Sequence, residues 1–114
     1  MIAAASLALL LTSPTWAQDH SGHAMPADSE SASSQAFATA NAKMHADMAM
    51  ELTGNADVDF IRGMIPHHRG AVDMARIVLE HGSDSEVKAL AEAVITAQEA
   101  EIAWMQEWLT KNGH

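Results

Sequence analysis

The sequence predicts an all-α protein, a small bundle of three to four helices. Apolar residues recur at helical spacing in three segments, and breaks that contain glycine, at residues 54–55, 82 and 112–113, end these segments. The chain has 114 residues, which is enough for one small domain. It contains no cysteine, so helix packing, a bound metal or both must hold the domain together without disulfides.

The amino-terminal segment is expected to lie outside this domain. Ile2 to Leu11 is an apolar run, and residues 13–17 (Ser-Pro-Thr-Trp-Ala) are typical of the cleavage zone of a secretory signal peptide. We therefore expect residues 1–17 to be removed after Ala17, leaving a periplasmic or secreted protein that is not inserted in the membrane. The alternative is an uncleaved anchor, but the run is shorter than the roughly 20 residues that span a bilayer.

Residues 18–34 are predicted to be a flexible linker, because they are polar and have no apolar periodicity. His20, His23 and Met25 within this linker could wrap a soft metal ion, or could belong to an ordinary solvated tail.

The bundle domain is expected over residues 35–112. Its first helix should begin after Ser33 or Ser34, either of which could be the N-cap, and should end at Gly54-Asn55. This helix carries thioethers and an imidazole that are candidate metal ligands, namely Met44, His45 and Met48. The methionines also fit the apolar face of the helix, where they would only fill a core.

The second helical region is expected from about Asp57 to His81. Pro66 should split it into a short arm and a longer arm, and Gly63 weakens its start enough that a loop is the alternative there. His81 lies in the last turn, where its charge suits the helix dipole, so we assign it a capping role.

One stripe of this second region combines two imidazoles with two thioethers. Residues at spacings of three and four share a helix face, and the stripe consists of Met64, His67, His68, Ala71 and Met74. Imidazole suits several transition metals, whereas a thioether selects soft Cu(I), so the combination favours copper over zinc. The alternative is that the methionines pack in a core and that Pro66 makes the two halves of the stripe diverge.

The third helix should begin at a capping box, Ser83-Asp84-Ser85-Glu86, with Ser83 as the N-cap, and should continue to about Lys111. Gln98 and Glu101 lie on its apolar stripe, where a buried carboxylate needs a partner. Glu101 could pair with Arg69, accept a hydrogen bond from a metal-binding histidine, or bind metal itself, and we favour the first two together. Met105 is one turn further on and is a further candidate thioether ligand.

Composition and motifs exclude several function classes. The formal net charge is −9, from 15 acidic and 6 basic residues, which argues against nucleic-acid binding. No glutamate has a histidine three residues later, so the Glu-x-x-His motif of di-iron carboxylate proteins is missing. The His-Glu-x-x-His motif of zinc proteases is missing as well.

From about Asp59 to Leu109, the chain resembles the DUF305 family, some members of which are periplasmic copper-binding proteins of the CopM type. The resemblance rests on Phe60, Met64, His67-His68, Gly70-Ala71, Met74-Ala75, Ala91, Ile95, Gln98, Glu101-Ile102, Met105 and Trp108-Leu109. It implies a ferritin-like or four-helix bundle that binds copper through His and Met. The ligands that it implies are Met64, His67, His68, Met74 and Met105.

These observations together predict a copper-binding protein of the cell envelope that sequesters or carries copper and contributes to copper tolerance. Methionine favours Cu(I), and the histidines also allow Cu(II). A partner would be another copper-handling protein, or a second copy of the chain in a homodimer. The alternatives are a cuproenzyme that oxidises Cu(I), and a metal-free helical interaction module whose methionines only pack.

Overall fold

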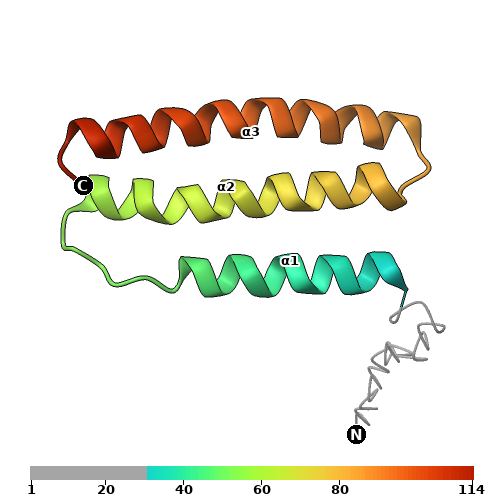
Figure 1. Ribbon diagram of the computed structural model, residues 1–114, viewed down its shortest axis with the longest axis horizontal. Helices are drawn as coiled ribbons and strands as arrows, with labels where there is room; N and C mark the ends of the chain where they lie inside the picture. The colour runs from blue at the N-terminus through green and yellow to red at the C-terminus, as the bar shows by residue number, and fades with distance from the viewer. Residues whose placement is uncertain (1–30) are drawn as a thin grey trace, which may run out of the picture.

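The computed structural model describes residues 31–114, which form three helices, and the predicted all-α fold is confirmed (Figure 1). The helices are α1 (Ala32–Met48), α2 (Ala56–His81) and α3 (Ser85–Lys111). α2 lies between the other two, and no Cα atom of α1 comes within 8 Å of one in α3. The helices are therefore arranged side by side, with α2 as the one that contacts both neighbours. The predicted signal peptide and most of the predicted linker lie outside the described residues.

α1 begins and ends earlier than predicted. Its N-cap is Ser31, whose Oγ accepts a hydrogen bond from the backbone N–H of Ser34 at 3.2 Å. The last residues of the predicted linker, from Ala32 to Ser34, therefore belong to α1. The helix also ends at Met48 rather than at Gly54-Asn55.

Residues 49–55 connect α1 to α2, and Asp59 holds the end of this connection. Its carboxylate accepts hydrogen bonds from the backbone N–H of Thr53 at 2.8 Å, from the Thr53 hydroxyl at 2.7 Å and from the N–H of Gly54 at 3.1 Å. These bonds, led by that of the Thr53 backbone, lower the pKa of Asp59 below its usual value. Gly54, with φ of 85°, thus belongs to the turn that leads into α2, and Asn55 is the N-cap of α2.

α2 is one continuous helix, so the predicted division at Pro66 is wrong, and so is the alternative of a loop at its start. A proline removes one hydrogen bond of the helix. Here Ile65 and Pro66 are both buried, and Ile61 and Ile65 form a core cluster with Met105 of α3. Packing against the neighbouring helices offsets the missing bond and keeps the helix intact.

α3 begins one residue later than the predicted capping box implies. The N-cap is Asp84 rather than Ser83, because the Asp84 carboxylate accepts hydrogen bonds from the N–H groups of Glu86 and Val87, both at 2.9 Å. The predicted end at Lys111 is confirmed, and Asn112 is the C-cap.

Gly70 lets α1 approach the backbone of α2. A Cβ atom at this position would lie 2.6 Å from Sδ of Met44 and 2.9 Å from its Cγ. Only a residue without a side chain leaves room for Met44. This contact fixes where α1 sits along α2.

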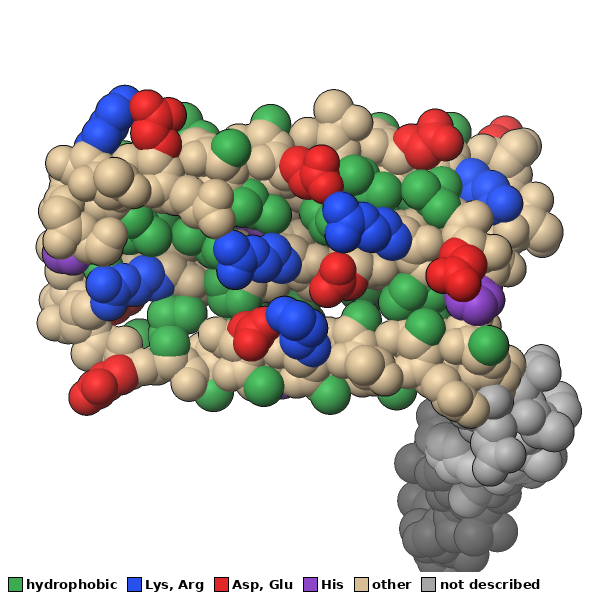
Figure 2. All heavy atoms as spheres, in the orientation of Figure 1, with side chains coloured by type: hydrophobic (Ala, Val, Ile, Leu, Met, Phe, Trp, Pro, Cys, Tyr) green, Lys and Arg blue, Asp and Glu red, His purple; other side chains and the backbone are tan. Residues whose placement is uncertain are grey.

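Basic side chains gather on one face of the molecule, along α2 (Figure 2). The spacing of seven between Arg62, Arg69 and Arg76 keeps them on this face, and Arg76 reaches Glu99 of α3 at 2.9 Å. The predicted pairing of Arg69 with Glu101 is not among the ion pairs of the described residues. Within residues 31–114, no helix is both long and apolar enough to cross a membrane.

Candidate metal centre

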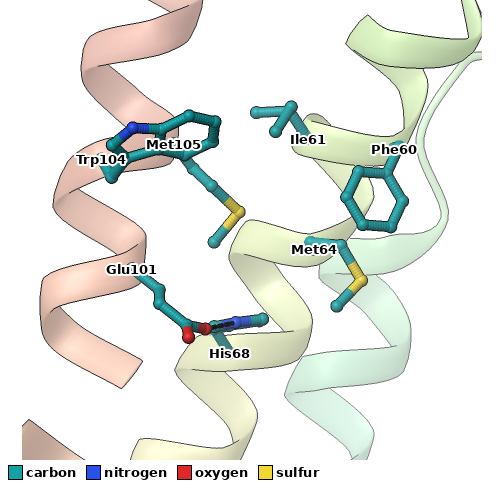
Figure 3. Close-up of a pocket in the computed structure, with 7 residues that line it drawn as sticks. All are labelled: Phe60, Ile61, Met64, His68, Glu101, Trp104 and Met105. Carbon is teal, nitrogen blue, oxygen red and sulfur yellow. Dashed lines mark hydrogen bonds and ion pairs between the residues drawn. The ribbon is translucent and has the colours of Figure 1, made fainter. Parts of the chain in front are cut away.

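A cavity of about 350 Å³ lies between α2 and α3, near the amino-terminal end of α2 (Figure 3). The side chains that line it come from both helices and are mostly apolar, namely Phe60, Ile61, Met64, His68, Glu101, Trp104 and Met105. Four of these carry metal-binding atoms, which are the imidazole nitrogens, the carboxylate oxygens and two thioether sulfurs. The helix pair therefore assembles nitrogen, oxygen and sulfur donors around one space.

His68 is the buried polar residue of this cavity. Its side chain is 11% exposed, and its Nε2 lies 2.6 Å from Oε2 of Glu101. An ionised carboxylate can only accept a hydrogen bond, so Nε2 carries the proton in this pair. The other ring nitrogen, Nδ1, is buried and has no hydrogen-bond partner among the described residues. In the neutral ring, Nδ1 has a free lone pair with which it could bind a cation.

Glu101 differs from the sequence prediction in its burial. The prediction placed it on a buried face, but its side chain is 61% exposed and reaches back to the edge of the cavity. Its contact is the predicted hydrogen bond to a histidine. A carboxylate on one ring nitrogen fixes the orientation of the ring and makes the other nitrogen a better donor.

The two thioethers differ in their exposure. Met105 is buried in the core cluster with Ile61 and Ile65, and Met64 packs against that cluster and is half-buried. Figure 3 shows the Met105 side chain extending from α3 toward α2, with His68 and Glu101 meeting across the gap between the helices. Both sulfurs thus share the cavity with the imidazole.

The other predicted ligands of α2 lie elsewhere. His67 is exposed and does not line the cavity, and the centre of its ring is 6.2 Å from that of His68. Met74 is 41% exposed and lines a second cavity, of about 310 Å³, further along α2. The structure brings His68, Met64 and Met105 together, and it places His67 and Met74 outside their cavity.

The predicted ligands of α1 do not line this cavity either. The sulfur of Met44 packs on Gly70, whereas His45 and Met48 are exposed. Gln98 of α3 is half-buried and is not part of the cavity lining. Among residues 31–114, no group of three or more His, Asp and Glu side chains is placed to hold a metal ion.

Residues 8–109 match the family described as a domain of unknown function, DUF305. The chain belongs to the DUF305 family. The predicted resemblance is thereby confirmed at the level of the family, whose description names no activity.

The DUF305 chain is also similar to one curated protein, "Uncharacterized protein L153" of Acanthamoeba polyphaga mimivirus. The two are 36% identical over 53 residues, which are 46% of this chain and 35% of the viral protein. The match thus spans about a third of the length of that relative.

The sequence prediction did not select three residues of the cavity wall as site residues, namely Phe60, Ile61 and Trp104. Trp104 is 59% exposed and lines the cavity next to Met105. Its spacing of three from Glu101 places it on the same side of α3, and this spacing could have identified it. The cavity thus has an aromatic wall beside the imidazole and the thioethers.

Proposed function

We propose that this DUF305 protein is a copper-binding protein of the cell envelope, of the CopM type, that sequesters or carries copper. In this proposal His68, Met64 and Met105 hold the metal, and Glu101 orients His68. The protein would be periplasmic or secreted, and it would contribute to copper tolerance by binding and releasing the ion.

The observation that carries the proposal is the buried Nδ1 of His68, which has no hydrogen-bond partner among the described residues. A buried polar atom without a partner costs about 1–3 kcal/mol. A cation at this nitrogen would satisfy its lone pair. The cavity also supplies the thioethers of Met64 and Met105, and thioethers select Cu(I).

The geometry of the ring supports the same proposal. Metal-binding histidines generally use one ring nitrogen for the metal and the other to donate to a carboxylate or a carbonyl group. His68 makes such a bond to Glu101, and the interaction joins α2 to α3. A ring held in this way needs little reorganisation when the metal binds.

Titration of the full chain with Cu(I), in competition with a chelator of known affinity, tests this function. We expect His68→Ala to weaken Cu(I) binding at least about tenfold, because a direct ligand is lost. His81→Ala is the matched control, since His81 is an imidazole at the far end of α2 and is expected to leave the affinity unchanged.

Equal affinities of the two variants would contradict the assignment of His68. Absence of Cu(I) binding by the unmodified chain would instead favour a metal-free helical module. Oxygen consumption beyond one equivalent per bound Cu(I) would favour a cuproenzyme. Circular dichroism of each variant establishes that the helices are retained.

A further inference from the structure

The face of the molecule opposite the arginine row is apolar, and no helix within residues 31–114 covers it. On α2 it follows one side of the helix, where residues recur at alternating spacings of four and three. These residues are Phe60, Met64, His67, Ala71, Met74 and Val78. From α3 it includes Val87, Leu90, Val94, Glu101 and Trp104, which line the two cavities together with residues of that stripe. We call this surface the open face.

Large apolar side chains of the open face are exposed to solvent. Phe60 and Leu90 are 63% and 64% exposed, and they lie at opposite ends of the surface. Among the residues that line the two cavities, Glu101 alone carries a formal charge. The surface therefore has the character of a buried helix–helix contact rather than that of a solvated face.

We propose that a second copy of this chain packs on the open face, in the antiparallel direction, and forms a homodimer. The open face runs about 27 Å along the helices, which is the length of the α2 segment from Phe60 to Val78. Two neighbouring helices, with axes about 9 Å apart, present a strip roughly 20 Å wide. The strip thus offers roughly 540 Å² on each partner, and the roughly 1,100 Å² in total exceeds the about 1,000 Å² that a biological interface should bury.

The antiparallel direction follows from the sizes of the side chains. At one end of the open face stand the bulky Phe60 and Trp104. At the other end, the second cavity has a volume of about 310 Å³, and its lining combines the small Ala71, Ala75 and Ala91 with larger apolar side chains, among them Leu90 and Phe37 of α1. A two-fold axis across the helices places the bulky end of each copy over the cavity of the other, and closes the assembly at two subunits.

The same arrangement adds a donor to the metal centre, and this part rests on the proposed copper function. Met64 and Met74 lie equally far from the midpoint of the stripe, at residue 69. An antiparallel pairing of α2 with its copy therefore brings Met74 of the partner subunit beside Met64. Each metal centre then contains a thioether from each copy, in addition to His68 and Met105.

Sedimentation equilibrium of the full chain tests the dimer. The unmodified chain is expected at twice its monomer mass of 12.2 kDa. Leu90→Glu places a charge on the open face and should give a monomer that keeps its helicity. Thr96→Glu adds the same charge at an exposed position of α3 outside both cavities, and should remain a dimer. The proposal would be overturned if the unmodified chain were a monomer, which is the result expected if residues 1–30 covered the face instead. Equal masses of the two variants would overturn it as well.

Cysteine cross-linking tests the direction, because the chain has no cysteine of its own. Phe60→Cys and Val78→Cys copies are mixed and treated with a short bismaleimide. The antiparallel dimer yields cross-links between the two kinds of copy, whereas Phe60→Cys alone yields none. The two positions are about 27 Å apart along α2, so the opposite result would overturn the antiparallel order.

A final comparison of Cu(I) affinities tests the dimer proposal and the copper proposal separately. Met74→Leu should weaken Cu(I) binding of the dimeric chain, and should have no effect when Leu90→Glu is also present. A dimer that binds no copper would contradict the proposed function and leave the dimer intact. Copper binding that is equally tight in the dimer and in the Leu90→Glu monomer would contradict the contribution of Met74.

Discussion

Nε2 of His68 and Oε2 of Glu101 are 2.6 Å apart, although 33 residues separate them in the chain. The contact joins α2 to α3 at the edge of the cavity, and Nδ1 of His68 has no hydrogen-bond partner within residues 31–114. Because each ring nitrogen has one role, the two side chains should be separable by mutation. Loss of the imidazole removes a donor, whereas loss of the carboxylate only releases the ring.

Glu101→Gln is expected to weaken Cu(I) binding by about tenfold, which is the lower end for loss of a group that orients a metal-binding histidine. The amide keeps an acceptor for Nε2–H but loses the negative charge that raises the basicity of the ring. Glu99→Gln is the control, because Glu99 is also exposed on α3 and pairs with Arg76 instead. Competition titration with a Cu(I) chelator measures both. An effect of Glu99→Gln as large as that of Glu101→Gln would point to general surface charge as the cause.

Met105→Leu is expected to weaken Cu(I) binding while changing the free energy of unfolding by less than about 1.5 kcal/mol. Leucine nearly conserves the volume of methionine in the core but has no sulfur. Met50→Leu is the control, since Met50 is half-buried and lines a different cavity, beside Arg62 and Arg69. Chelator competition and urea unfolding together separate ligand loss from destabilisation. Unchanged affinity in Met105→Leu would remove this sulfur from the metal centre.

Gly70→Ala is expected to destabilise the protein by about 1–3 kcal/mol through overpacking, partly offset by the higher helix propensity of alanine. Its Cβ would collide with the side chain of Met44. Gly63→Ala is a matched control within the same helix, because a Cβ there meets nothing within 4 Å. This control should stabilise by up to about 1 kcal/mol. Urea unfolding measures both changes, and equal effects would contradict the close contact of α1 with Gly70.

Asp59→Asn is expected to destabilise the protein at neutral pH and to make its stability less sensitive to acid. The pKa of Asp59 is lowered in the folded state, above all by the hydrogen bond from the Thr53 backbone. The stabilisation is therefore complete above the unfolded pKa of about 4, and it is lost as pH falls through the lower folded value. Urea midpoints measured from about pH 7 down to about pH 2.5 should show the two proteins converging in acid. Asp57→Asn, in the same helical turn, is the control for loss of a negative charge at the start of α2. A loss of acid sensitivity in this control as large as in Asp59→Asn would contradict the role of the hydrogen bonds from Thr53 and Gly54.

The helices themselves could be predicted well because their signals are local. Apolar spacing identified three helical segments, and the break at Gly82 correctly separated α2 from α3. The N-cap of α3 was misplaced by one residue because Ser83 and Asp84 both have capping side chains, and only the geometry selects Asp84. Continuity at Pro66 could not be predicted, because it depends on the packing of Ile61 and Ile65 against Met105, far away in the sequence.

The cavity is lined by His, Met and Glu side chains of the kinds proposed from the sequence, but periodicity alone does not show which of the candidate residues share one cavity. His67 and His68 look equivalent on a helical stripe, yet one is exposed and the other is buried against α3. That difference arises from where α3 lies, which periodicity does not specify. A histidine was one of the partners expected for Glu101, because a carboxylate on an apolar stripe needs a partner. The expected burial of Glu101 and its pairing with Arg69 are not found among the described residues. That no Cα atom of α1 lies within 8 Å of one in α3 could be seen only in the structure.

The position of α1 has a consequence for how the molecule opens. Of the other two helices, only α2 has Cα atoms within 8 Å of α1, to which residues 49–55 join it. The core of Ile61, Ile65 and Met105 belongs to α2 and α3. Detachment of α1 therefore leaves that core and the His68–Glu101 contact in place. Amide protons of α1 should then exchange with solvent through a partial opening of the molecule. Amide protons of the α2–α3 hairpin should exchange only through global unfolding, and therefore more slowly. The fold thus consists of one helix, α1, that can unfold locally, and a more stable hairpin of α2 and α3 that contains the cavity.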